Sequence, residues 1–106
     1  MRFGRKGTSG TYDTFILEML DGKNALSIAE DDNGLRIKAL LIKKDGKEHY
    51  FTTDEISKIS WSLINKHDYI EYSEPGKEAQ EPIITLTLKT KKVPTDNYTI
   101  LEATYK

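Results

Sequence analysis

Hydrophobic and polar residues alternate along most of the chain, in short runs separated by turn-forming residue pairs. Alternation with a period of two is typical of strands with one buried face. Asp-Gly and Asn-Gly pairs favour two-residue hairpin turns, because both turn positions accept a positive φ. Three such pairs punctuate the first half of the chain: Asp21-Gly22, Asn33-Gly34 and Asp45-Gly46. The pattern therefore predicts a four-stranded antiparallel meander that begins near residue 12.

The registers implied by these turns agree on one apolar face. With Asp21-Gly22 at a hairpin tip, Phe15 lies opposite Ile28. With Asp45-Gly46 at another tip, Leu41 lies opposite Tyr50 and Leu40 lies opposite Phe51. Because side chains alternate between the two faces of a strand, the three turns place one set of residues on a common face. The predicted core face comprises Phe15, Leu17, Met19, Leu26, Ile28, Leu35, Ile37, Ala39, Leu41 and Tyr50.

The second half predicts one helical turn followed by further strands. Thr52 and Glu55 have the spacing of a capping box, which indicates a short helical turn near residues 53–58. Trp61 stands in an alternating run, and a turn within residues 65–68 is expected to pair it with Tyr72 in a hairpin. Residues 84–88 and 98–105 are two more strands, and the last is expected at a sheet edge because both of its faces are mixed.

The expected fold is mainly β, with about seven or eight antiparallel strands in one small domain that forms a barrel or a sandwich. Residues 1–11 lack periodicity and are expected to be a flexible basic arm, and residues 12–106 form the β-rich domain. An α+β alternative stays open, because the apolar residues of segment 12–21 also fit a helical stripe capped by Gly22.

The composition of the chain argues against several classes of protein. The 16 Lys and Arg residues nearly balance the 17 Asp and Glu residues, so the whole chain has no net field that would steer it to nucleic acid or to an anionic membrane. The absence of cysteine excludes disulfides and cysteine-based zinc sites. The longest apolar run, residues 39–42, is far shorter than a membrane span. A cytoplasmic protein with no membrane association is the expectation.

No motif for catalysis, a cofactor or a metal is evident. His67-Asp68 is the only adjacent pair of a histidine and an acid, and it falls in a predicted turn without further ligand residues nearby in the sequence. We therefore expect no catalytic residue, no cofactor and no metal, and a chain that is not an enzyme.

The second face of the predicted meander carries the functional hypothesis. It is polar at Arg36 and Lys38 and becomes apolar toward the Asp45-Gly46 tip. Either the second sheet, the helical turn or the basic arm covers this apolar surface within the fold, or another protein or another copy of the chain covers it. We therefore expect a non-enzymatic protein-interaction or assembly module. The predicted interaction patch is Leu40, Ile42, His49 and Phe51.

Clustered basic residues keep a second function open, that of a nucleic-acid-binding β-barrel of the oligonucleotide-binding type. Such a groove would combine cations for phosphates with aromatic platforms for bases, and binding would weaken steeply with salt. The candidate basic contacts, which could also order on a protein partner, are Arg2, Arg5, Lys6, Arg36 and Lys38.

Overall fold

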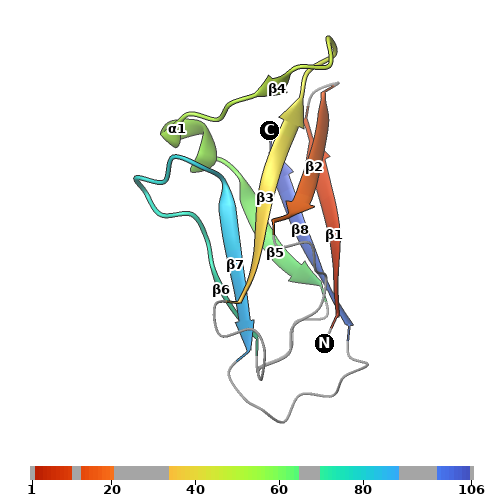
Figure 1. Ribbon diagram of the computed structural model, residues 1–106, viewed down its shortest axis with the longest axis vertical. Coiled ribbons are helices and arrows are strands. Elements are labelled where there is room, and N and C mark those ends of the chain that lie inside the picture. The colour runs from red at the N-terminus through yellow and green to blue at the C-terminus, as the bar shows by residue number, and fades with distance from the viewer. Residues whose placement is uncertain (1, 11–12, 21–33, 65–69, 89–97, 106) are drawn as a thin grey trace.

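A computed structural model describes residues 2–10, 13–20, 34–64, 70–88 and 98–105, which form two facing β-sheets and one short helix (Figure 1). The small sheet has the strand order β1 (Arg2–Ser9), β8 (Tyr98–Tyr105), β5 (Ser60–Ile64). The large sheet has the order β2 (Thr14–Met19), β3 (Leu35–Ile42), β7 (Ile83–Leu88), β6 (Ile70–Ser73), and β4 (Glu48–His49) also pairs with β3. Helix α1 (Thr53–Ile56) follows β4 at one end of the molecule.

The mainly β fold predicted from the sequence is confirmed, and the described strands are sandwich-like without closing into a barrel. The alternative helix over residues 12–21 is wrong, because residues 14–19 form β2. Burial alternates along β2, with Phe15 and Leu17 buried between exposed residues, and that pattern suits a sheet with one buried face.

The core lies between the inner faces of the two sheets. Alternate residues of β2 and β3 point into it, which confirms most of the predicted core face. Leu101 and Ala103 of β8 close it from the small sheet, and both are fully buried. Leu26 and Ile28 of the predicted face lie outside the described residues. The buried members of the predicted face are Phe15, Leu17, Leu35, Ile37, Ala39 and Leu41, with Met19 packed against them.

The predicted flexible arm is wrong for residues 2–9, which form β1. This strand lies parallel to β8, from the pair Arg2 and Tyr98 to the pair Ser9 and Tyr105. Backbone hydrogen bonds of a ladder do not depend on apolar alternation, so a strand rich in glycine and basic residues escapes a search for periodicity. β8 consequently lies between β1 and β5, in the middle of its sheet and not at the predicted edge.

Two predicted neighbour relations are also wrong. The sequence predicts a further strand between β2 and β3 in the sheet, but β2 pairs directly and antiparallel with β3. The residues of that predicted strand lie outside the described part of the chain. Trp61 in β5 pairs with Ala103, whereas Tyr72 in β6 pairs with Leu86, so the expected Trp61–Tyr72 hairpin is split between the two sheets. Alternation indicates which face of a strand is buried, but it does not specify the neighbouring strand.

The hairpin between β3 and β4 has a longer loop than the sequence suggests. The Lys43 N–H donates to the Lys47 carbonyl at 2.9 Å, and the Gly46 N–H donates to the Lys43 carbonyl at 2.9 Å. Gly46 has φ +84°, the left-handed conformation that closes a three-residue hairpin loop. The loop is therefore one residue longer than the predicted Asp45-Gly46 turn.

This extra residue exchanges two neighbouring aromatic side chains. Leu41 pairs with His49, one position before the expected partner Tyr50. A one-residue shift moves every following side chain to the opposite face. Tyr50, predicted in the core, is 81% exposed, and Phe51, predicted at the surface, is 9% exposed and belongs to the core.

The two sheets approach each other closely at Gly7 in β1. A Cβ atom at this position would lie 2.5 Å from the carbonyl oxygen of Phe15 in β2. Nearby, the Arg5 guanidinium donates to the Leu17 carbonyl at 3.1 Å, so β1 also satisfies a backbone acceptor of β2. The absence of a side chain at Gly7 therefore permits the contact between the sheets.

Replacing Gly7 with alanine should destabilise the domain, because the added methyl group would meet backbone that cannot rotate away. We expect a loss of about 1–3 kcal/mol in the free energy of unfolding, measured by urea denaturation. Gly76→Ala is the matched control, since no atom lies within 4 Å of a Cβ there. Equal stability of the two variants would contradict the close approach of β1 and β2.

The exchange of Tyr50 and Phe51 is tested by alanine at each position. Phe51→Ala should lower the free energy of unfolding by about 3–5 kcal/mol, because it leaves a cavity in the core. Tyr50→Ala should change it by less than about 0.5 kcal/mol, as is usual at an exposed position. If Tyr50→Ala lost more stability than Phe51→Ala in thermal or urea unfolding, the predicted two-residue turn and its register would be correct instead.

Candidate functional site

The outer face of the large sheet carries an apolar surface at the end near β4. Leu40 and Ile42 point outward from β3 and are half-buried, and Ile16 of β2 lies beside Leu40 and is 43% exposed. Tyr50 follows β4 on the same face, because Glu48 pairs with the outward-pointing Ile42 and every second side chain of an extended segment points to the same side. We call Ile16, Leu40, Ile42 and Tyr50 the outer patch.

A pocket of about 130 Å³ opens next to the outer patch. It lies where the β4 segment and the residues preceding β7 both approach β3; the Ala39 N–H donates to the Pro82 carbonyl at 3.0 Å on one side of it. Apolar and charged groups share its wall. The lining residues are Lys38, Ala39, Leu40, Glu48, His49, Tyr50, Phe51, Gln80, Glu81 and Pro82.

The charges around the pocket are unequal. Lys38 contacts the Glu81 carboxylate at 3.4 Å, which balances these two charges. Glu48 lies on the same outer face, and no residue in the described parts of the chain forms an ion pair with it. The pocket therefore has one excess negative charge beside apolar side chains and an exposed aromatic ring.

The structure divides the four residues of the predicted interaction patch. Leu40 and Ile42 share the outer face, as expected. Phe51 is a core residue, and His49 shares its inward parity, so neither belongs to the outer patch. Tyr50 was missed because the sequence Asp45-Gly46 fits a two-residue turn as well as the end of a three-residue loop.

The candidate basic contacts are distributed over both sheets. Arg5 is engaged with a β2 carbonyl, and Lys6 stands beside Glu102 in the β1–β8 register. Arg36 and Lys38 lie on the outer face of the large sheet. The side chain of Arg2 lies outside the described part of the structure. The described basic side chains therefore do not share one face.

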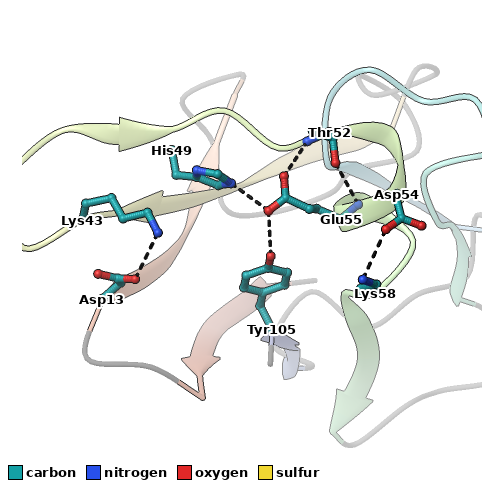
Figure 2. Close-up of polar contacts among 8 residues, drawn as sticks. All are labelled: Asp13, Lys43, His49, Thr52, Asp54, Glu55, Lys58 and Tyr105. Atoms are coloured by element: carbon teal, nitrogen blue, oxygen red, sulfur yellow. Dashed lines mark hydrogen bonds and ion pairs between the residues drawn. The ribbon is translucent and has the colours of Figure 1, made fainter.

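Side chains from three different elements, β4, α1 and β8, meet at the Glu55 carboxylate, as Figure 2 shows. His49 Nε2 lies 2.8 Å from Glu55 Oε2, and the Tyr105 hydroxyl donates to the same oxygen at 3.0 Å. The Thr52 N–H donates to Glu55 Oε1 at 3.0 Å, and the Glu55 N–H donates to the Thr52 hydroxyl at 3.2 Å, which confirms the capping box. We call His49, Thr52, Glu55 and Tyr105 the Glu55 cluster; it joins β4, α1 and β8.

Phe51 packs among the rings around this cluster. Its ring centroid lies 5.5 Å from His49 and 5.2 Å from Tyr105, and both pairs are edge-to-face. Phe15 of β2 is 6.4 Å away, also edge-to-face. Edge-to-face contacts place the positive ring edge against the negative ring face. The cluster and the rings therefore fix the segment that leads from β4 to α1.

The hydrogen bonds to Glu55 set its protonation. The Thr52 N–H, followed by His49, lowers the pKa of the Glu55 carboxyl from 4.5 to about 2, against the opposing effect of burial. Burial, followed by the contact with Glu55, raises the pKa of the Tyr105 hydroxyl. A carboxylate with so low a pKa is a weak base near neutral pH, so this arrangement is suited to holding structure more than to transferring protons.

Neither a metal-binding cluster nor a membrane-spanning helix is found among the described residues. Within residues 2–10, 13–20, 34–64, 70–88 and 98–105, no group of three or more His, Asp or Glu side chains is arranged to hold a metal ion. Across the same residues, no helix has the length and apolarity needed to cross a membrane. The predicted pair His67-Asp68 lies outside them.

Comparisons with protein-family models, with curated proteins and with solved structures find no match for this chain. Function is therefore inferred from the geometry of the outer patch, the pocket and the Glu55 cluster.

Stability should depend on pH through Glu55. Because the folded-state pKa is lowered, the contribution of Glu55 is complete above pH 4.5 and is lost as the pH falls toward about 2. In urea unfolding between pH 7 and pH 2, Glu55→Gln should be less stable than the parent at pH 7, and the difference should shrink toward pH 2. Asp54→Asn, at an exposed position paired with Lys58, is the control and should follow the parent. If the stability difference between Glu55→Gln and the parent stayed constant from pH 7 to pH 2, the protonation of Glu55 would not be the cause of the pH dependence.

Proposed function

We propose that this chain is a non-enzymatic protein-interaction module of the cytoplasm that binds a partner polypeptide through the outer patch. The observation that carries the proposal is the exposure of Tyr50, 81%, beside a pocket and next to Leu40. A large aromatic side chain held at the surface contributes much contact area at low entropic cost, which is why tyrosine is enriched in protein interfaces.

The Glu55 cluster supports this proposal because it restricts the segment that presents Tyr50. His49 is held by Glu55 on one side of Tyr50, and Phe51 is held in the core on the other. A contact residue whose backbone is already ordered loses less entropy when a partner binds. The exposed ring is therefore presented from a preorganised segment.

Binding to nucleic acid is the second candidate, and the distribution of charge favours it less. Three of the lysines in the described ranges contact acids: Lys38 with Glu81, Lys43 with Asp13, and Lys58 with Asp54. Neutralised lysines release few counterions from phosphates, so they contribute little to affinity for nucleic acid.

The proposal is tested by photo-crosslinking through the outer patch. The full chain carrying benzoylphenylalanine at position 50 is irradiated in an extract of the cells that naturally express it. We expect a protease-sensitive product of defined mass, identified by mass spectrometry, that is absent when the probe replaces Tyr72, which is 37% exposed in β6.

Competition makes the result specific to the outer patch. Excess unlabelled parent chain should suppress the product, whereas the Tyr50→Ala and Ile42→Glu variants should not; Ile42→Glu places a second negative charge beside Glu48. Unfolding curves establish that each competitor is folded. Equal suppression by the parent and by folded Tyr50→Ala, or a product degraded by nuclease, would overturn the proposal.

A further inference from the structure

The pocket beside Tyr50 has the size of a single side chain. Its volume of about 130 Å³ is close to that of a cavity of about 150 Å³ that accommodates one benzene ring. Pockets for cofactors and drug-sized ligands have volumes of about 300–1,000 Å³. The pocket is therefore suited to an anchoring side chain of a bound polypeptide and is too small for a complete cofactor.

The groups around the pocket select the chemistry of that side chain. Leu40 and Pro82 provide apolar surface for an aliphatic stem, and the Tyr50 ring is exposed at the margin. Glu48 provides a carboxylate without an ion-pair partner among the described residues, and the Glu81 carboxylate, 61% exposed, forms an ion pair only with Lys38 among them. A long side chain with a cationic end can contact the apolar surface, the aromatic ring and the carboxylates at the same time. Its aliphatic stem packs on the apolar surface, and guanidinium and ammonium groups bind both carboxylates and aromatic faces.

We propose that this pocket binds a basic side chain, with arginine preferred, from the partner polypeptide. This inference rests on the proposed function and specifies the partner as a segment that presents a cation next to apolar residues. The planar guanidinium can contact the Glu48 carboxylate in a bidentate manner while it stacks on Tyr50, which the ammonium of lysine cannot do. The apolar neighbours of the arginine would cover Ile16 and Ile42 of the outer patch.

The pocket wall is held by contacts on its inner side. His49 lines the pocket and also contacts Glu55 at 2.8 Å, so the Glu55 cluster fixes the segment that carries Glu48 and Tyr50. On the opposite wall, the Thr53 hydroxyl donates to the Ala79 carbonyl at 3.1 Å, which ties helix α1 to the segment that leads to Gln80 and Glu81. The two walls are thus connected through α1.

The test uses small probes and the full ¹⁵N-labelled chain. N-acetyl-arginine methylamide is titrated to millimolar concentration and amide chemical shifts are followed by NMR; N-acetyl-citrulline methylamide is the neutral control of nearly the same shape. We expect saturable shifts concentrated at Leu40, Tyr50 and Gln80 with the arginine probe, and smaller shifts with citrulline.

Variants assign the effect to the proposed groups. Glu48→Gln should weaken binding of the arginine probe by up to about fivefold, which corresponds to the loss of one exposed ion pair. Tyr50→Leu should weaken it by a similar factor through loss of the aromatic face. Glu102→Gln, which removes the same charge from the outer face of the small sheet, should leave binding unchanged.

Shifts of equal size with both probes, shifts scattered over the surface, or equal affinity of Glu48→Gln and the parent would each overturn this inference. The proposed function has a separate readout, because crosslinking at position 50 does not require a basic anchor. A specific crosslink without arginine binding would retain the interaction surface and reject the pocket's preference, whereas arginine binding without a specific crosslink would reject the proposed function.

Discussion

The register of the hairpin between β3 and β4 is the constraint on which the rest of this end of the molecule depends. Gly46 adopts a positive φ and closes a three-residue loop, so Leu41 pairs with His49. That pairing directs His49 and Phe51 inward and Tyr50 outward. A two-residue loop would have reversed all three side chains, and the core, the Glu55 cluster and the outer patch would each have lost a member.

The inward residues connect the two sheets. Phe51 reaches the rings of Phe15 in the large sheet and Tyr105 in the small sheet, while Glu55 joins His49 to Tyr105 (Figure 2). At the same end, Gly7 allows β1 to approach the backbone of Phe15 in β2. Close backbone contact and a shared carboxylate therefore stabilise the same sheet-to-sheet interface.

The outward residues of the same segment form the surface to which we assign function. Glu48 and Tyr50 alternate with His49 and Phe51, so the packing that stabilises the fold also orders the proposed binding residues. Binding energy at such a surface is concentrated in a few anchors, and an ordered aromatic beside a pocket for one side chain meets that requirement. This coupling predicts that core variants near Phe51 affect binding through the position of Tyr50.

Local patterns in the sequence determined most of the described strands other than β1, the buried faces of β2 and β3, and the capping box at Thr52 and Glu55. These features follow from side-chain periodicity and from hydrogen bonds between residues close in the chain. Tertiary structure alone decided the strand neighbours, the pairing of β1 with β8 and the exchange of Tyr50 with Phe51. Backbone ladders form between any strands brought into register, and a loop that differs by one residue satisfies the same turn sequence, so only packing of the whole domain selects among them.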